Sequence, residues 1–479
     1  MKIKAILLTV VLSFFLFGFL VAQDKTLKLH LRGVMESTCS LQPLSGPDAG
    51  KIIQQKEQIK NGESAIFTVT KSQLPGEFIL RFNFKQTLNS TPYPVEKIIL
   101  INEEDLELWV NPLFYNNEDS TYFQKNEVEN TLRFKLLNEL AIEKKSLNIL
   151  QNFLLNYEEI NTLFLKEGNK EFEKLRIGFN QWLKMKQNLY PSTFAVKALQ
   201  VEYTPKMLWK GTAKERLEGM MDHYFDEMDF KDTLLIKTEA FKEWINRYIN
   251  NYTQLSNTTR SRDSLLTVAA KIAIEKSRKG NGLVYGWMVD YFYNGFEQFN
   301  IASGLLMLEP YLNDPLCLTS KKGAIQKRIT GIRTLVKGVL APDFKMLTDA
   351  DKGISFLNYA TDSKYKLVIF WSAGCGHCEE LLKKLYSYTQ NESNKKLLDV
   401  FALSVDETAT EIEEWKTKIN MLKSWHHIRV NGGVNSKEAN DYFVLSTPTM
   451  FLVDSKTNLI ASVPDTFEQL ESNLIGIKN

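Results

Sequence analysis

The sequence predicts a multidomain protein with an N-terminal antiparallel β domain, a central all-α region and a C-terminal α/β domain. Three patterns predict this order. Apolar residues alternate with polar ones in short runs before residue 111, and they recur at helical spacing from about residue 118 to 330. After residue 334, short apolar runs alternate with amphipathic stretches, as an α/β layer requires. We therefore expect four segments, which are residues 1–22, 23–115, 116–333 and 334–479.

Residues 1–22 have the features of a secretory signal peptide. Lys2 and Lys4 precede an apolar run from Ala5 to Val21, and the small residue Ala22 follows. We expect this segment to direct export and to be cleaved. The alternative is an uncleaved membrane anchor, because the apolar run is close to the length that spans a bilayer.

The remainder of the chain carries almost no net charge. The full sequence has 59 basic and 57 acidic residues, and removing Lys2 and Lys4 leaves 57 of each. Such a balance gives no one-signed field that would attract nucleic acid or anionic lipid. We therefore expect no nucleic-acid partner.

Residues 23–115 are predicted to form a β-sandwich-like domain. Three runs, residues 27–31, 65–69 and 78–84, show the period of two that is typical of half-buried strands. Residues 98–101 and 106–110 suggest two more strands around an acidic turn. His30 lies in the first run, and we interpret it as a structural or surface residue because an isolated histidine rarely forms a ligand set.

Residues 116–333 are predicted to be helical, with a role in positioning or selecting a partner. Examples of helical spacing are 128–132–136–140, 172–175–179–182 and 241–244–248. One stretch gathers Glu215, Glu218, Asp222, His223 and Asp226. We interpret it as a solvated acidic helix face rather than a metal site, because further histidine ligands are absent nearby.

The most informative stretch of the last segment joins a strand to a helix through two cysteines. The apolar run from Leu367 to Trp371 predicts a buried strand, and leucines at helical spacing follow Cys378. Cys375 then lies at a helix N-terminus, where free N–H groups and the helix dipole favour an anion. A thiolate is such an anion and is the nucleophilic form of cysteine. Cys378 follows one turn later, close enough to form a disulfide with Cys375.

This stretch resembles the thioredoxin superfamily, and the resemblance covers residues 334–479. Trp371, four residues before the first cysteine, matches the family's tryptophan. The run Ser446-Thr447-Pro448-Thr449 is similar to the cis-proline loop that faces the disulfide in the family. The run from Ala341 to Phe344 resembles the opening of the branch that holds the TlpA/ResA-like thiol–disulfide oxidoreductases and the peroxiredoxins.

The resemblance implies a site in which Pro448 faces Cys375 and the Thr447 backbone binds a partner chain. Two acids of the family are missing, because Ile369 and Leu381 stand at their positions, so the proton acceptor for Cys378 is unassigned. His377 between the cysteines resembles the disulfide isomerase motif. An imidazolium there would stabilise a neighbouring thiolate and make the disulfide more oxidising.

Strand and helix are expected to alternate through the last segment as the family fold implies. The expected elements are a hairpin formed by 341–344 and 353–357, strand 366–371, helix 376–390, strand 398–405, helix 411–421, helix 436–443, strands 450–453 and 459–463, and helix 467–477. A polar loop is expected at 391–396, and residues 425–430 are expected to end the crossover.

The resemblance implies an enzyme, an exported thiol–disulfide oxidoreductase of a bacterial periplasm or cell envelope. Its partners would be protein thiols and disulfides, together with a membrane or periplasmic redox partner that resets the dithiol. No cofactor or metal is implied.

Two alternatives stay open for the function. The first is a thiol peroxidase, although Val368 and Ser372 replace the proline and threonine of the peroxiredoxin pattern. The second is a non-enzymatic envelope interaction protein with a redox-sensing dithiol.

Export leads to an oxidising compartment, so Cys39 and Cys317 either form a disulfide or are two buried thiols.

Overall fold

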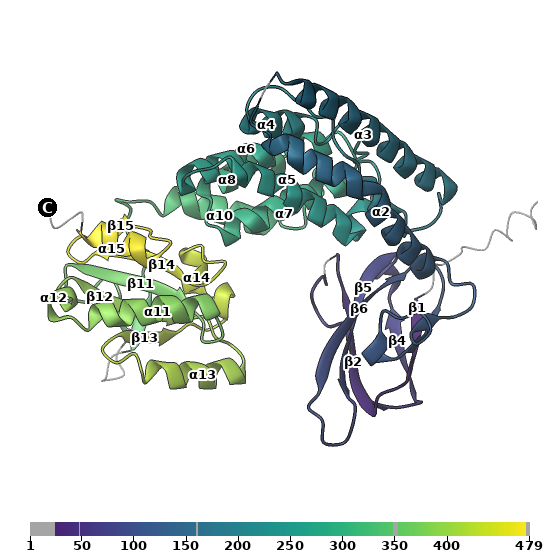
Figure 1. The fold of residues 1–479 in the computed structure, drawn as a ribbon. Helices are drawn as coiled ribbons and strands as arrows, with labels where there is room; N and C mark the ends of the chain where they lie inside the picture. The colour runs from purple at the N-terminus through teal and green to yellow at the C-terminus, as the bar shows by residue number, and fades with distance from the viewer. Residues whose placement is uncertain (1–23, 47, 160, 348–352, 476–479) are drawn as a thin grey trace, which may run out of the picture. The chain divides into compact units, whose positions relative to one another are not determined.

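Figure 1 shows the computed structural model, which describes residues 24–46, 48–159, 161–347 and 353–475. The chain divides into two compact units, residues 1–285 and residues 286–479. The predicted signal segment, residues 1–22, lies outside the described residues, as do residues 348–352. Within the described ranges, no helix combines the length and the apolar character that crossing a bilayer requires.

The first unit begins with a β domain, which confirms the expected fold class of this region. Its described strands form two four-stranded sheets, ordered β4-β1-β7-β8 and β3-β2-β5-β6. The strands are β1 (Lys25–Leu31), β2 (Glu36–Pro43), β3 (Gln54–Lys60), β4 (Ser64–Val69), β5 (Gly76–Lys85), β6 (Tyr93–Ile101), β7 (Leu106–Val110) and β8 (Tyr122–Phe123). Apolar residues from both sheets form one buried core, so the sheets pack face to face.

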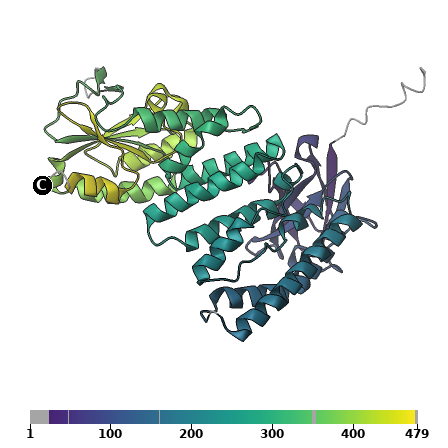
Figure 2. The same ribbon diagram turned by 90° about the horizontal axis from the view of Figure 1, so that it is seen from above.

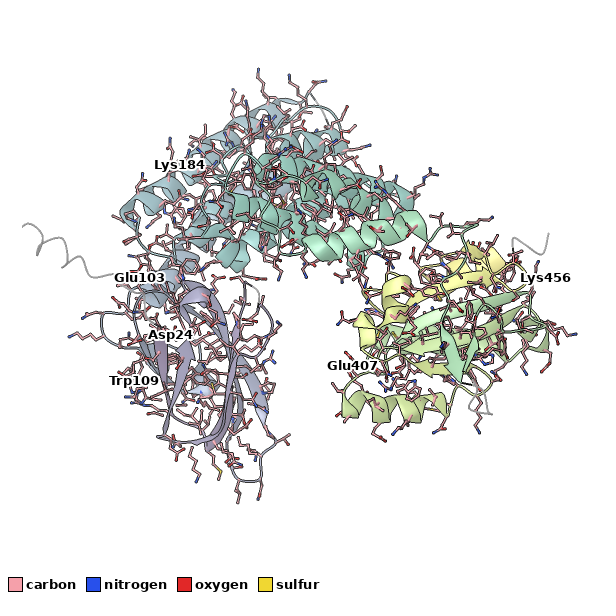
Figure 3. The ribbon with its side chains drawn as sticks, turned by 180° about the vertical axis from the view of Figure 1, so that it is seen from behind. Asp24, Glu103, Trp109, Lys184, Glu407 and Lys456 are labelled. Atoms are coloured by element: carbon pink, nitrogen blue, oxygen red, sulfur yellow. The ribbon has the colours of Figure 1, made fainter. Side chains whose placement is uncertain are left out.

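The domain differs from the expected antiparallel sandwich in one strand pair. Strands β1 and β7 pair in parallel, whereas the other neighbouring strands are antiparallel. Strands β6 and β7, which follow each other around an acidic turn, belong to different sheets. The chain therefore crosses from one sheet to the other at this turn. Figure 3 labels Trp109 on β7, where it stacks on His30 with ring centroids 4.7 Å apart.

The rest of the first unit is helical, as the apolar spacing predicts. Its longer helices are α2 (Glu129–Asn156), α3 (Leu163–Leu189), α4 (Ala213–Asp222), α5 (Glu239–Gln254) and α6 (Thr259–Ser277). Four of them begin after a threonine whose hydroxyl accepts a hydrogen bond from a backbone N–H of the first turn. Buried aromatic side chains of α5, among them Trp244 and Tyr248, pack against Tyr224 and Phe225. Figure 3 labels Lys184 on α3.

The second unit joins short helices to an α/β domain. The helices are α7 (Gly282–Gln298, which begins in the first unit), α8 (Ala302–Met307), α9 (Glu309–Leu312) and α10 (Lys322–Thr334). The α/β elements are β9 (Lys345–Leu347), β10 (Gly353–Ser355), β11 (Tyr365–Trp371), α11 (Gly376–Thr389), α12 (Glu392–Lys395), β12 (Leu398–Ser404), α13 (Ala409–Ile419), β13 (His426–Arg429), α14 (Lys437–Asp441), β14 (Thr449–Asp454), β15 (Ile460–Ser462) and α15 (Phe467–Ile475).

One mixed sheet organises this domain, and its layers can be followed in Figure 2. Its described strands are ordered β13-β12-β11-β14-β15, with β11, β12 and β13 parallel and β14 antiparallel to β11. Alternate residues of β11 enter two different cores. One face packs against α11 and α15, and the other against α14 and the segment that contains Phe344 and Phe356. Strand β11 is therefore buried on both sides at the centre of the sheet.

Three short elements of this domain differ from the expected ones. The first hairpin strand is β9 at Lys345–Leu347 and not residues 341–344. Residues 426–429 form the parallel edge strand β13 instead of only ending the crossover, and helix α12 lies inside the expected polar loop at 391–396. Strand β13 lacks an alternating apolar pattern because it is an edge strand whose four residues are all half-buried.

Candidate active site

Helix α11 begins directly after Cys375, which is its N-cap residue. Cys375 has an extended backbone, and its Sγ accepts a hydrogen bond from the backbone N–H of Cys378 at 3.2 Å. A sulfur in this position takes the role that Ser, Thr or Asp oxygens usually have at a helix N-terminus. Because the helix end carries a partial positive charge, it favours negative charge on this sulfur. The side chain is half-buried, so Sγ remains accessible.

Cys378 lies one turn into α11 and is completely buried in the core between the helix and the sheet. Burial raises the pKa of the Cys378 thiol to about 12, and its hydrogen bond with Cys375 acts in the same direction. The two sulfurs of the motif are therefore unlike, since one is accessible and the other is a protected, protonated thiol. Both are free thiols in this structure.

The cis-proline loop faces the dithiol. The Thr447–Pro448 peptide bond is cis, and the Cys375 thiol donates a hydrogen bond to the Thr447 carbonyl oxygen at 3.4 Å. Strand β14, which begins at Thr449, is antiparallel to β11, so the loop before β14 lies beside the turn after β11. The pairing of two central strands thus brings together residues that are 72 positions apart.

Asp406 is a buried acid under the active-site turn, and sequence reasoning missed it. Its Oδ1 accepts a hydrogen bond from Ser372 Oγ at 2.6 Å, and its Oδ2 accepts one from Ser404 Oγ at 2.7 Å. The backbone N–H of Ala373 lies 3.0 Å from both oxygens. The carboxylate therefore fixes the turn between Trp371 and Cys375. A polar residue directly after a buried strand is the sequence signal that could have found it.

Lys418 of α13 is a second residue that sequence reasoning missed. Its Nζ donates a hydrogen bond to the Ala373 carbonyl oxygen at 2.8 Å and lies 3.3 Å from Glu379 Oε2. Lys383 and, to a smaller extent, Lys418 hold the pKa of the exposed Glu379 below its usual range. The N–H of Ala373 is thus bound by the Asp406 carboxylate, and its C=O is bound by the Lys418 ammonium.

Two residues of the preceding helices support the cis-proline loop. Glu297 of α7 lies 3.5 Å from Ser446 Oγ and forms an ion pair with Arg328 of α10 at 3.2 Å. Burial raises the pKa of Glu297, while Arg328 and Ser446 act against this shift. Helices that precede the α/β domain in the chain therefore contact the loop that faces Cys375.

A groove with a volume of about 570 Å³ lies beside the dithiol. Helix α11 contributes His377 and Lys384 to its walls, and the cis-proline loop contributes Thr447 and Pro448. The C-terminal end of α7 and the start of α15 complete the lining. His377 is exposed at this groove. The groove reaches the cis-proline loop and is large enough to hold part of another polypeptide.

Other residues of this domain support the dithiol from the core or lie at the opposite end of the sheet. Trp371 is fully buried at the end of β11, and Ile369 and Leu381 lie in the same core as Cys378. His426 lies 3.1 Å from Asp399, at the end of β12 opposite the active-site turn. Figure 3 shows the two ends of this sheet, with Glu407 labelled near the active-site turn and Lys456 at the other end.

The acidic cluster near α4 and Cys39, which were considered as a metal site and as part of a disulfide, lie in the first unit. Glu215 caps α4 by a reciprocal hydrogen-bond pair with Thr212, and His223 lies 2.7 Å from Asp226. No group of three or more metal-binding side chains occurs among the described residues. Cys39 is a free thiol buried in the β core, so it is not part of a disulfide.

Comparison with known proteins agrees with this geometry. Residues 362–459 match a family model described as thioredoxin-like. The C-terminal region is therefore thioredoxin-like, as the motifs predict. The sequence matches no curated protein.

Several solved structures from Bacteroides species are similar to the chain. A thioredoxin-like protein from Bacteroides caccae is 18% identical, with a TM-score of 0.39, and the match covers 57% of this chain and 98% of that one. The thioredoxin domain of a thiol-disulfide oxidoreductase from Bacteroides vulgatus is 23% identical, with a TM-score of 0.26 and coverage of 30% and 99%. A thiol-disulfide oxidoreductase from Bacteroides fragilis is 23% identical, with a TM-score of 0.25 and coverage of 29% and 98%.

Proposed function

We propose that this protein is a thiol–disulfide oxidoreductase that exchanges disulfides with protein partners. One observation carries the proposal. An accessible sulfur, Cys375, lies at a helix N-cap, and a buried thiol, Cys378, lies one turn later behind it. This is the arrangement that a nucleophile and a resolving thiol require.

The first step forms a mixed disulfide. The Cys375 thiolate attacks one sulfur of a partner disulfide, the Cys375–partner S–S bond forms, and the partner S–S bond breaks. The leaving partner sulfur takes the electron pair as a thiolate. The backbone N–H of Cys378, 3.2 Å from Cys375 Sγ, stabilises the attacking sulfur before the reaction.

The second step releases the partner. Cys378 loses its proton to solvent and attacks Cys375 Sγ, which forms the Cys375–Cys378 disulfide and expels the second partner thiolate. The partner gains two electrons and the dithiol loses two. Run in reverse, the same steps oxidise a partner dithiol, so the redox partner that resets the pair determines the direction. The buried environment of Cys378 keeps its thiol protonated, which disfavours attack before the mixed disulfide has formed.

The groove beside the dithiol gives the partner chain a place to lie. The Thr447 backbone is placed beside Cys375, and an extended partner segment could add main-chain hydrogen bonds there. His377 at the same groove would lie next to the partner's disulfide and favour negative charge on the leaving sulfur when it is protonated.

The N-terminal sequence supports a proposal on location. A basic start, an apolar run and a small residue at Ala22 are typical of a secretory signal, so we propose export to the periplasm or envelope of a bacterium. Fusing residues 1–30 to a reporter that is active only after export tests this. An inactive reporter would contradict export.

Reduction of insulin by dithiothreitol, followed by turbidity, tests the redox function. We expect Cys375→Ser to remove the catalysed rate and Cys317→Ser, a matched change at a cysteine outside the motif, to retain it. Unchanged catalysis by Cys375→Ser would contradict the mechanism.

A second experiment traps the partner. Cys378→Ala lacks the resolving thiol, so we expect it to accumulate a mixed disulfide through Cys375 that dithiothreitol releases. The non-enzymatic alternative predicts instead that partner binding survives replacement of both cysteines by serine.

A further inference from the structure

A pocket of about 740 Å³ lies in the first unit, far in the sequence from the dithiol. Helices α2, α4 and α5 and the segment 201–205 form its walls. Of its 22 lining residues, eight are Asn or Gln and none is Asp or Glu. Ligand pockets are usually lined mainly by apolar groups, so this lining does not suit a small apolar ligand. It offers neutral groups that both donate and accept hydrogen bonds.

The carboxamides on α2 form a regular row. Asn148, Asn152 and Asn156 are spaced four residues apart, so they lie on one face of the helix. Each step along this row rises about 6 Å. Two residues of an extended chain span about 6.6 Å, and every second peptide group faces the same way. The row therefore repeats at nearly the spacing of the same-facing peptide groups in an extended polypeptide.

Helix α5 offers the same chemistry. Asn250 and Gln254 of α5 are also four residues apart and line the pocket. Among the described contacts, the side chains of Asn148, Asn152, Asn250 and Gln254 form no hydrogen bond with the protein. Each of these amides can therefore donate to a carbonyl and accept from an N–H of a bound chain.

Two alternative ligand classes fit the pocket less well. Its aromatic residues Tyr203, Tyr224 and Trp244 are 7%, 5% and 2% exposed, so no ring face is open for a sugar to stack on. Lys144 and Arg247 are both paired with Glu202, at 2.7 and 3.3 Å. Glu202 compensates one of these two charges, and the third lining cation, Lys214, lies 3.8 Å from Glu218. Each cation at this pocket thus has a carboxylate partner already, which weakens the pocket as a site for a phosphate or another small anion.

We propose that this amide-lined pocket binds an extended polypeptide segment through its backbone, with little dependence on the segment's sequence. The site uses groups common to every peptide bond, so it selects for an unfolded or flexible chain rather than for one side chain. The proposal concerns binding alone and does not require the cysteines to react.

Fluorescence anisotropy with the full chain tests the proposal. The probe is a labelled, cysteine-free peptide of ten neutral residues, and a second probe has the same sequence with every second backbone nitrogen methylated. We expect the first probe to bind and the methylated probe to bind at least tenfold more weakly. Absence of binding, or equal binding of the two probes, would overturn backbone recognition.

Two double variants locate the binding. Asn148→Leu with Asn152→Leu keeps the approximate size of the side chains and removes their hydrogen bonds, and we expect at least a tenfold loss of affinity. The matched control changes two exposed amides of α3, Gln181→Leu with Asn188→Leu, and should bind as the unchanged chain does. Circular dichroism checks that both variants fold. Unchanged affinity in the pocket variant, or displacement of the peptide by maltohexaose, would overturn the assignment.

Because the probe lacks cysteine, its binding and the insulin assay can fail independently. A chain with Cys375→Ser and Cys378→Ser should bind the peptide as tightly as the unchanged chain. Loss of peptide binding in this variant would show that the peptide binds at the dithiol groove and would overturn the proposed site.

Discussion

Replacing Asp406 by alanine should loosen the active-site turn without removing either cysteine. The carboxylate binds three donors, which are Ser372 Oγ, Ser404 Oγ and the Ala373 N–H. The two hydroxyls can rotate toward other acceptors, but the Ala373 amide is fixed and its residue is 2% exposed. Its lost bond to a charged group corresponds to about 1.5–3 kcal/mol. At 1.4 kcal/mol for each factor of ten, local exchange of this amide should become about 10- to 100-fold faster.

Hydrogen–deuterium exchange of the full chain, resolved to residues 372–378, measures this effect. A local readout is needed because a chain with two compact units need not unfold in a single transition. Asp406→Asn keeps one acceptor oxygen, so its exchange should lie between that of the unchanged chain and that of Asp406→Ala. Glu407→Ala removes the neighbouring exposed carboxylate and serves as the control.

The assay can refute the role of Asp406 in two ways. Equal exchange of the 372–378 segment in Asp406→Ala and in the unchanged chain would show that the carboxylate does not hold the turn. Equal acceleration by Glu407→Ala would show that loss of negative charge, rather than loss of the hydrogen bonds, causes the effect.

Three further predictions concern the cysteines and the cis-proline loop. In Cys375→Ser, alkylation of Cys378 at pH 8 should be at least 100-fold slower in the folded chain than in the urea-unfolded chain. The reason is that burial raises the pKa of the Cys378 thiol to about 12, which leaves little reactive thiolate. Equal rates would contradict this. The second prediction concerns stability: because the folded chain favours the protonated Cys378 thiol, the free energy of unfolding should keep this contribution below about pH 8.5 and lose it as the pH rises toward 12. Cys378→Ala should flatten this pH dependence in urea titrations. Glu297→Ala should slow insulin reduction several-fold but leave reduction of the small substrate hydroxyethyl disulfide unchanged. The reason is that Glu297 contacts Ser446 of the loop proposed to bind the backbone of a protein partner. Equal slowing of both reactions would count against this role.

The dithiol could be predicted from the sequence because its geometry is local. A buried strand, a sharp turn and a helix place Cys375 at the N-cap whatever the rest of the chain does. The strands with strict alternation, such as β4, could be predicted for the same reason. Strand β3 could not, because its sequence is mostly polar and only Ile59 is buried.

The supporting residues could not be predicted because distant segments bring them together. Asp406 reaches Ser372 only because β11 and β12 pair in parallel with Trp371 opposite Ser404. A one-residue shift of this register would move Asp406 away from the turn. Glu297 depends on contacts across 149 positions with Ser446. A single sequence contains neither the register nor the packing, so these roles become visible only in three dimensions.

The difference between the two cysteines follows from the way α11 begins. Cys375 is extended and lies outside the helix, so its sulfur turns toward the open end of the helix and accepts the N–H of Cys378. Cys378 is inside the helix, and its sulfur faces the core that contains Trp371. The backbone N–H of Cys378 therefore stabilises the Cys375 sulfur, while the core around Cys378 shields its own sulfur. A change that unwinds this first turn should affect attack and resolution together, whereas a change confined to the groove should affect only the choice of partner.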